Sequence, residues 1–355
     1  MKVSVLGAGA IGSTFGGLLQ HDAPDLEVLL VARGAHGRVL AERGMLIVDG
    51  PWGTREIRIA SSSKPSAVAG SQFVFLTVKS QDTEQAAAAA APHWAGATVV
   101  SIQNGINDHR LAAHVDAARL VMGMTATNMA LVEPGRVSLQ LGGATMLGPA
   151  AGQAGGEHVA SAVALLRRIR CSTLKFLEHP NAIGARYNKL AVNALGYASC
   201  LSASNFITEA LAHAPWRAAV GLPLVAECRH VFDRAGIALE PIPGVPTLPK
   251  LERLMRLMSA PLVGPAIAFG ARRLFNRKPI VFSLLQDLTR GKPTEVDYVN
   301  GEIVRLAESV GLAAAANAEV VRLVRELEGR GRGSFCSRAE VIEWFTRLAR
   351  PPVTP

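Results

Sequence analysis

The most constraining feature of this 355-residue chain is a glycine-rich turn between a predicted strand and a predicted helix at its start. Residues 2–6 (KVSVL) predict a strand, and Gly7, Gly9 and Gly12 then follow in the pattern GxGxxG before a helix of small residues. A second predicted strand at 26–33 (LEVLLVAR) completes a strand–helix–strand unit of about 30 residues. This arrangement is typical of the doubly wound α/β fold that binds dinucleotides.

Each glycine of the turn is expected to have a separate structural role. The first permits a tight turn, the second lets the backbone approach a pyrophosphate, and the third lets the helix pack close to the strand. The N-terminus of the helix then offers free N–H groups to the phosphates. A glycine-rich turn without a ligand is the alternative. The predicted cofactor-binding loop comprises Gly7, Ala8, Gly9, Ala10, Ile11 and Gly12.

The residue at the end of the second strand bears on the choice of dinucleotide. An enzyme that uses NAD usually has an acidic residue there, which accepts hydrogen bonds from the ribose 2′-hydroxyl. This chain has Arg33 instead, with Arg38 nearby. A guanidinium matches a 2′-phosphate, so the sequence favours NADP(H) over NAD. A solvated loop arginine is the alternative.

Further strands at 73–78, 98–102 and 120–125 alternate with helical segments and predict a parallel sheet. Ligands of such sheets bind at the carboxyl ends of the strands. Lys79 and Asn104 follow two of these strands directly. Taken alone, Lys79 is typical of a surface residue, and Asn104 in Asn-Gly is equally typical of a turn.

The chain changes character near residue 179. Two strand-like segments, 136–143 and 171–178, and a helix between them extend the first domain to residue 179, so we predict a Rossmann-type domain at 1–179. From 180 to 355 the pattern is helical, with an apparent insertion at 240–280 and a basic tail at 330–355. Helices are predicted at 182–200, 216–236, 296–311, 316–328 and 338–349.

Polar clusters interrupt these helices. Lys189 and Asn193 are four residues apart and share one helix face, and Ser283 has the same relation to Asp287. Glu295 follows a Gly-Lys-Pro turn. Taken alone, Lys189 is typical of a solvated helix lysine, and Glu295 is equally typical of a helix N-terminus.

Composition excludes few partners. The net charge of +9 attracts anions of any kind, and basic segments such as 271–278 and 330–333 are more typical of a solvated face than of a nucleic-acid site. The four cysteines lack the spacing of metal ligands, which favours reduced thiols and a cytoplasmic protein without a metal. Glycines break the apolar run at the start, and no segment is long enough to cross a membrane.

These motifs together resemble the ketopantoate reductase (2-dehydropantoate 2-reductase) family over about residues 1–325. The resemblance is carried by an ordered set of motifs: GAGAIG, Arg33, VK at 78–79, QNG at 103–105, YNKLAVN at 187–193 and SLLQDLTRGKPTEVDYVNG at 283–301. It implies reduction of a 2-oxo acid to a 2-hydroxy acid by NADPH, in a cleft between a Rossmann domain and a helical domain.

The resemblance also assigns roles to residues. Lys189 matches the proton donor, and Glu295 matches a carboxylate near the nicotinamide and the reacting centre. Asn193 and Ser283 match substrate contacts, while Lys79 and Asn104 line the nicotinamide side, where Asn104 also meets the substrate. A lysine suits this role because it can stabilise the alkoxide formed at C2 and then protonate it.

One departure from the family bears on the substrate. The family commonly has a second asparagine four residues after the first, and this chain has Tyr197 there. The resemblance implies reduction of 2-dehydropantoate, in pantothenate and coenzyme A synthesis, and Tyr197 leaves another oxo acid or an imine as the alternative substrate. A non-catalytic NADP-binding regulator is the alternative of another class, and a homodimer is the one protein partner considered.

Overall fold

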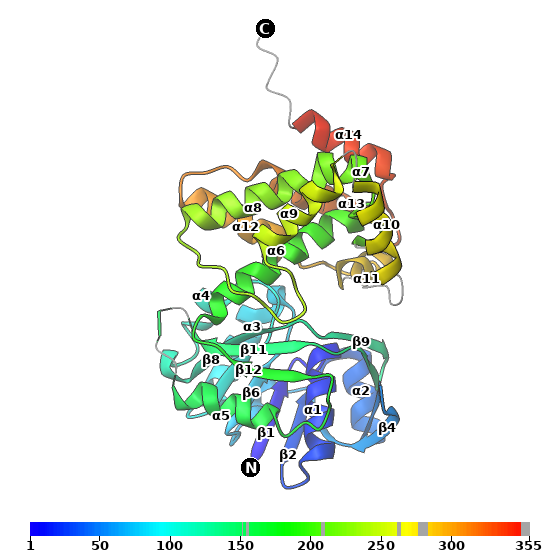
Figure 1. Ribbon diagram of the computed structural model, residues 1–355. Helices are drawn as coiled ribbons and strands as arrows, with labels where there is room; N and C mark the ends of the chain where they lie inside the picture. The colour runs from blue at the N-terminus through cyan, green and yellow to red at the C-terminus, as the bar shows by residue number, and fades with distance from the viewer. Residues whose placement is uncertain (151, 154–155, 207–209, 261–263, 276–282, 349–355) are drawn as a thin grey trace. The chain divides into compact units, whose positions relative to one another are not determined.

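The computed structural model describes residues 1–150, 152–153, 156–206, 210–260, 264–275 and 283–348 (Figure 1). The chain forms two compact units. The first comprises Met1–Arg186 with Ile242–Val245, and the second comprises Tyr187–Pro241 with Pro246–Pro355. The predicted division at residue 179 precedes helix α6 (Ala182–Cys200), whose first residues group with the first unit.

An eight-stranded sheet forms the centre of the first unit. Its neighbours are all parallel, except that β11 runs antiparallel to β8. The sheet was predicted as parallel, and the antiparallel strand was not anticipated. In spatial order the strands are β12 (Lys175–Glu178), β11 (Ala144–Pro149), β8 (Leu120–Thr125), β7 (Thr98–Ser101), β6 (Phe73–Leu76), β1 (Lys2–Leu6), β2 (Glu27–Val31) and β5 (Ala60–Ser62).

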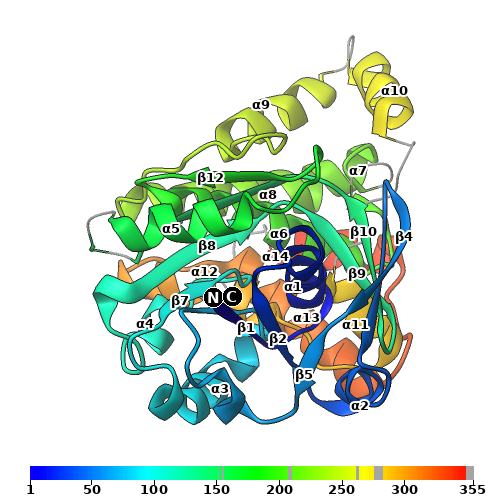
Figure 2. The ribbon, with the colours of Figure 1, turned by 90° about the horizontal axis from the view of Figure 1, so that it is seen from below.

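Helices cover both faces of this sheet, which explains why its central strands are continuous apolar runs. Helices α1 (Ala10–Asp22) and α5 (Glu157–Leu166) share one buried core with one face, and α3 (Thr83–Ala90) belongs to a second core with α4 (Asp108–Leu111) on the other face. Figure 2 shows α5 and α3 on opposite sides of the sheet. The predicted doubly wound architecture is confirmed.

A second sheet, which the sequence did not reveal, lies beyond α1. It has the order β4 (Gly53–Arg58), β3 (Met45–Gly50), β10 (Arg136–Leu141) and β9 (Asn128–Glu133). The segment 136–143, predicted as a strand of the first domain, pairs here rather than in the main sheet. Helix α1 fits between the two sheets because Gly16 faces Leu30 of the main sheet and Gly17 faces Leu46 of the small one.

Helices joined by turns and loops make up the described residues of the second unit. The predicted helix at 216–236 is interrupted, because a π-helical turn at Arg217–Gly221 precedes α8. Arg217 is buried there, and its guanidinium donates to the carbonyl oxygens of Leu211 and Met258. The helices are α6, α7 (Ala214–Trp216), α8 (Leu222–Arg234), α9 (Leu248–Met258), α10 (Gly264–Phe275), α11 (Ser283–Arg290), α12 (Val296–Ser309), α13 (Ala315–Arg330) and α14 (Arg338–Leu348).

The predicted insertion at 240–280 has two parts. Ile242–Val245 returns to the first unit, where Ile242 packs with Met124, Met146 and Ala185, and the helices α9 and α10 follow. The remainder of the insertion, at 261–263 and 276–280, lies outside the described residues, as does the end of the basic tail at 349–355.

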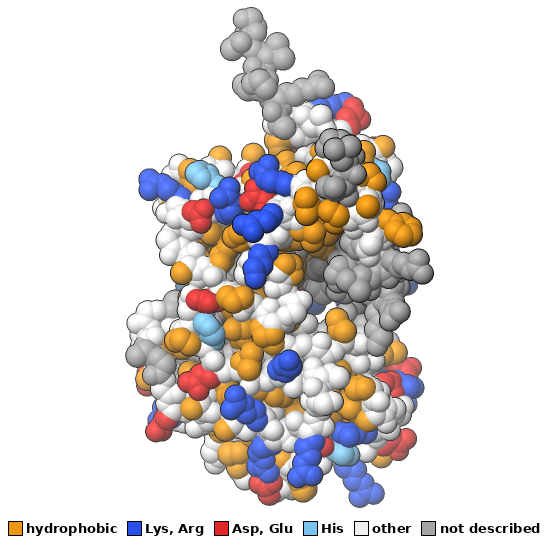
Figure 3. Space-filling view, in the orientation of Figure 1, with side chains coloured by type: hydrophobic (Ala, Val, Ile, Leu, Met, Phe, Trp, Pro, Cys, Tyr) orange, Lys and Arg blue, Asp and Glu red, His pale blue; other side chains and the backbone are white. Residues whose placement is uncertain are grey.

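None of the helices in the described part of the chain combines the length and the apolar character that a membrane span needs. On the face seen in Figure 3, acidic and basic side chains are interspersed on both units.

We expect Gly17→Ala to destabilise the protein, because a Cβ atom there would lie 2.7 Å from Leu46 Cδ2 and 3.2 Å from Val48 Cγ2. Overpacking of this kind costs about 1–3 kcal/mol in the free energy of unfolding. The matched control is Gly329→Ala in α13, where a Cβ meets nothing within 4 Å and the better helix propensity of alanine should stabilise by about 0.5–1 kcal/mol. Denaturant unfolding measures both, and a stabilised Gly17→Ala variant would contradict the packing of α1.

Candidate active site

The glycine-rich loop is held between two strands of the main sheet. The backbone N–H groups of Gly7 and Ala8 both donate to the carbonyl of Val31 at 3.0 Å, and Thr77 Oγ1 donates to the carbonyl of Gly7 at 2.9 Å. Gly7 has a φ of +92°, which disfavours any residue with a side chain. The loop therefore has one fixed path at the carboxyl end of β1.

The space around the glycines fits a bound dinucleotide. A Cβ atom at Gly12 would collide with Thr77 Oγ1 and lie 2.7 Å from Val5 Cγ1, so this glycine lets α1 approach the sheet. A Cβ atom at Gly9 would meet nothing closer than the Gly7 carbonyl oxygen at 3.9 Å. The loop thus presents an open backbone at Gly9, directly before the first N–H groups of α1, which have no acceptor inside the helix.

Arg33 is the N-cap residue of α2 (Gly34–Arg43) and is exposed. Its guanidinium lies 3.7 Å from the Asp82 carboxylate, and both side chains are largely in solvent, 63% and 41% exposed. Such an ion pair contributes little free energy, so Arg33 can exchange it for a stronger anion. Arg38, on the same helix, is also exposed.

The register of the main sheet places Lys79 and Asn104 at the same edge as the glycine loop. Leu6 of β1 is opposite both Val31 of β2 and Leu76 of β6, and Leu76 is in turn opposite Ser101 of β7. The residues that follow these positions therefore emerge together. Lys79 and Asn104 are both partly buried there.

Three further polar side chains, of which the sequence motifs included only Gln103, hold these two loops together. The Ser80 hydroxyl donates to the Asn104 carbonyl at 2.8 Å, and Asn107 Nδ2 donates to the same carbonyl at 2.9 Å. Gln103 Nε2 donates to the carbonyl of Val78 and to Thr83 Oγ1, both at 2.8 Å. The backbone beside Asn104 and Lys79 is thus cross-linked between the ends of β6 and β7.

The second polar cluster lies within the second unit. Lys189, Asn193 and Tyr197 occupy one face of α6 at successive four-residue intervals. Lys189 and Asn193 are partly buried, whereas Tyr197 is 1% exposed. This environment differs from that of a solvated helix lysine.

Lys189 is electrostatically coupled to Glu295. Burial lowers the pKa of Lys189 to about 8, and the negative charge of Glu295 opposes that shift. Glu295 is itself buried at the start of α12, and its side chain makes no capping hydrogen bond there. Glu295 is thus the N-cap residue of α12, as the helix N-terminus alternative has it, but Thr294 Oγ1 rather than the Glu295 carboxylate accepts from a backbone group there, the Val296 N–H group at 3.3 Å.

The Tyr197 hydroxyl lies near residues of α11 and α12. Burial raises the pKa of Tyr197 well above its ordinary value, the charge of Glu295 raises it further, and the Ser283 hydroxyl partly offsets this rise. Asp287, buried on α11, adds to the rise. The Tyr197 hydroxyl nevertheless has no hydrogen-bond partner of ordinary geometry among the described residues. The structure thus brings Lys189, Tyr197, Ser283 and Glu295 into one cluster.

A buried amide network fixes α12 against α6. Asn300 Nδ2 donates to Asn317 Oδ1 at 3.0 Å and to the carbonyl of Ala194 at 3.4 Å. Asn317 in turn donates from its side chain and its backbone to the Glu227 carboxylate, at 2.8 and 2.9 Å. Because Ala194 belongs to α6 and Asn300 to α12, this network sets the position of Glu295 relative to Lys189.

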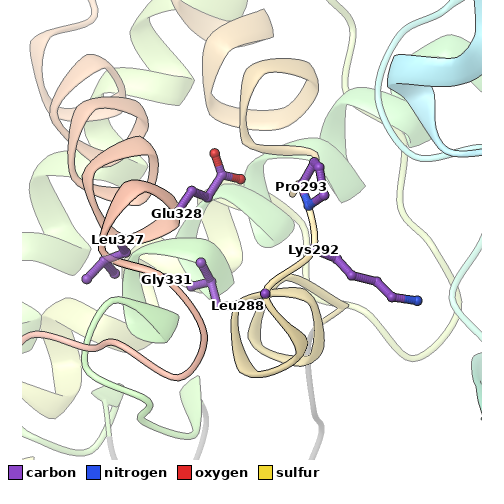
Figure 4. A pocket seen from close by; sticks show the side chains of 7 residues that line it. Leu288, Lys292, Pro293, Leu327, Glu328 and Gly331 are labelled. Carbon is purple, nitrogen blue, oxygen red and sulfur yellow. The ribbon is translucent and has the colours of Figure 1, made fainter.

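A pocket is lined by residues of α11, of the turn that precedes α12, and of α13 and its end. Its lining residues are Leu288, Gly291, Lys292, Pro293, Leu327, Glu328 and Gly331 (Figure 4). The Glu328 carboxylate accepts a hydrogen bond from the Thr294 N–H group at 2.8 Å, and the Lys292 side chain extends away from Leu327. The hydrogen bond from Thr294 to Glu328 therefore links α13 to the turn that carries Glu295. In the part of the chain that the structure describes, no group of three or more His, Cys, Asp or Glu side chains could hold a metal ion.

The fold defines a Rossmann-type protein with a helical second unit, and comparison with known families identifies it as an oxidoreductase that acts on CH–OH groups. A family model described as ketopantoate reductase PanE/ApbA matches residues 3–152, and the model of the C-terminal part of that family matches residues 181–328. The chain therefore belongs to the ketopantoate reductase family.

Individual relatives agree with this assignment. The 2-dehydropantoate 2-reductase of Pyrococcus horikoshii is 30% identical over 94% of this chain and all of its own length, and that of Halobacterium salinarum is 29% identical over 92% and 98%. A PanE/ApbA family ketopantoate reductase from Ralstonia eutropha JMP134 superimposes with a TM-score of 0.73 at 27% identity, covering 93% of this chain and 99% of that one. A D-mandelate dehydrogenase solved with NADH and anilino(oxo)acetate shares the fold, with a TM-score of 0.73 at 22% identity over 93% of this chain and 99% of that one.

Proposed function

We propose that this protein reduces the 2-oxo group of 2-dehydropantoate to a hydroxyl, with NADPH as the cofactor and Lys189 as the acid. The observation that carries the proposal is the burial of Lys189 beside Glu295, which lowers the pKa of the ammonium to about 8. An acid with a pKa near neutrality transfers a proton efficiently at physiological pH. The names of the relatives from Pyrococcus horikoshii and Halobacterium salinarum support this substrate.

NADPH supplies a hydride to the 2-carbon of the oxo acid when it is bound. Lys189 Nζ donates a proton to the oxygen on that carbon, and Glu295 favours the charged lysine before the transfer. Asn193 and Ser283 are neutral donors suited to the carboxylate or hydroxyl groups of the substrate.

The first unit holds the cofactor in this proposal. The open backbone at Gly9 and the N-terminus of α1 receive the pyrophosphate. Arg33 meets the 2′-phosphate of the adenosine ribose. Lys79 and Asn104, at the same edge of the sheet, meet the nicotinamide end.

A second candidate function is reduction of a different 2-oxo acid by the same residues. The observation that favours it is Tyr197, whose phenol is buried at the position where the family resemblance implies a second asparagine. Its hydroxyl lies buried near Ser283 and has no hydrogen-bond partner of ordinary geometry among the described residues. A phenol is larger than a carboxamide and leaves less room beside Ser283.

We expect reduction to slow as pH rises through about 8, because the protonated form of Lys189 is lost above its pKa. Oxidation of the hydroxy acid should show the opposite trend, since it requires neutral lysine. Lys189→Ala should lower kcat about 10²–10⁴-fold. Lys189→Arg should also be slow and lack this pH dependence, because a guanidinium stays protonated. The control Lys250→Ala removes an exposed lysine of α9, and full activity of Lys189→Ala would contradict the role.

We expect Arg33→Ala to raise the KM for NADPH by about 10- to 100-fold and to leave the KM for NADH nearly unchanged, because only NADPH carries the 2′-phosphate. Initial rates at varied cofactor measure both constants. Arg43→Ala, at the exposed end of the same helix, is the matched control. Equal effects of Arg33→Ala on both cofactors would show that this arginine does not read the phosphate.

We expect the purified protein to reduce 2-dehydropantoate. The reaction is measured as the decrease in NADPH absorbance, at a saturating concentration of the cofactor. Tyr197→Phe, which removes only the phenolic hydroxyl, should lower kcat/KM about 2- to 10-fold if that hydroxyl binds the substrate. A panel of straight-chain, branched and aromatic 2-oxo acids separates the two candidate functions. Turnover of another acid, with 2-dehydropantoate inert and then accepted by Tyr197→Asn, would establish the second one.

A further inference from the structure

His36 is a buried histidine in the first turn of α2, three residues after Arg33. It is 7% exposed, and neither the sequence pattern nor the proposed chemistry assigns it a role. Its ring contacts two other parts of the first unit, helix α1 and the turn between β9 and β10.

Both ring nitrogens of His36 are used. The backbone N–H group of Gly135 donates to Nδ1 at 2.9 Å, and Nε2 lies 3.0 Å from the Ser13 hydroxyl oxygen. The Ser13 hydroxyl in turn donates to the carbonyl of Ala8, at 3.0 Å. These bonds form a continuous series from the β9–β10 turn to the glycine-rich loop.

The chemistry of the two ends determines where the protons lie. The Gly135 N–H group can only donate, so Nδ1 must carry a lone pair. The Ala8 carbonyl can only accept, so the Ser13 hydroxyl uses its proton there and accepts from His36. All bonds are satisfied only by neutral His36 with its proton on Nε2. Burial also lowers the pKa of His36, which favours the neutral ring.

The series connects the two parts of the cofactor site. Ser13 holds the glycine loop twice, because its backbone N–H group donates to the Gly9 carbonyl at 2.9 Å while its hydroxyl holds the Ala8 carbonyl. His36 belongs to the same helical turn that Arg33 caps. The link therefore runs from the loop proposed to bind the pyrophosphate to the turn proposed to bind the 2′-phosphate.

The side of His36 away from the loop is packed as well. Gly135 has a φ of +82°, its carbonyl accepts from the Ile47 N–H group at 2.9 Å, and a Cβ atom at that position would lie 2.7 Å from Val39 Cγ1 of α2. The β9–β10 turn is thus fixed against α2, and the imidazole has one position.

We propose that His36 is a positioning residue for NADP, which acts through Ser13 to set the spacing between the glycine loop and Arg33. The inference rests on the proposed cofactor. In this proposal NADPH contacts both the glycine loop and Arg33, whereas NADH lacks the 2′-phosphate and contacts only the glycine loop. Loss of the link should therefore affect NADPH more than NADH.

Two substitutions at His36 separate its hydrogen bonds. His36→Asn can keep an acceptor for the Gly135 N–H group but does not reach Ser13, whereas His36→Gln can place an amide donor near Ser13. Ser13→Ala removes the link at its centre with a small change in volume. His93→Asn, at an exposed histidine of the same unit, is the matched control.

The experiment is fluorescence titration of each variant with NADPH and with NADH, together with kcat and thermal melting. We expect His36→Asn and Ser13→Ala to raise the Kd of NADPH about 3- to 10-fold, to raise that of NADH less, and to leave kcat at saturating NADPH unchanged. His36→Gln should recover much of the loss. The double variant His36→Asn/Ser13→Ala should have a Kd for NADPH no higher than that of either single variant, because both substitutions break the same series of hydrogen bonds.

Equal weakening of both cofactors, or an unchanged Kd for NADPH in folded His36→Asn and Ser13→Ala, would overturn the inference and leave the proposed function standing. Wild-type protein that binds neither dinucleotide would overturn the proposed cofactor instead, and the inference with it.

Discussion

The close approach of α1 to the main sheet is the constraint on which the first unit depends. A helix can lie this near a strand only where side chains are missing, and Gly12 and Gly16 leave that space facing Val5 and Leu30. The same approach brings the start of α1 to the ends of β1 and β6, where Thr77 holds the Gly7 carbonyl. The close approach of α1 therefore determines both the packing of this helix on the sheet and the path of the glycine loop. A methyl group at Gly12 would disturb both.

The second unit meets a different constraint, since a lysine and a glutamate that are largely removed from water need each other. Lys189 keeps a pKa of about 8 rather than a lower one because Glu295 opposes the effect of burial. The pair is useful only if α6 and α12 hold a fixed register. Asn300 and Asn317, both fully buried, provide hydrogen bonds that apolar side chains could not, and such bonds are directional.

Elements whose formation depends on nearby residues could be predicted from the sequence. The strands β1, β2, β6, β7 and β8, the glycine loop and the helical second half follow from apolar periodicity and glycine spacing. The small sheet escaped prediction because β3 and β4 are half-exposed strands joined by a tight turn, and β10 pairs with β3 from far along the chain. The π-helical turn escaped because the partners of Arg217 lie about six and forty residues away.

The site divides in the same way. Some site residues could be predicted because their spacing or their place after a strand is visible in the sequence. These are the glycines of the loop, Arg33 and the polar residues spaced four apart on a helix. Residues that act through a neighbour, such as Ser80 and His36, leave no such pattern, because they bind backbone groups of distant segments.

Ile242–Val245 has a consequence for how the protein can be divided. This short return places Ile242 against Met124 and Met146, so the polypeptide passes from one unit to the other three times, after residues 186, 241 and 245. A fragment ending at Arg186 would lack its own covering for those two methionines. A fragment beginning at Tyr187 would carry four residues that belong to the other core. The two halves are therefore less suited to separate expression than a simple order of a Rossmann part followed by a helical part would suggest.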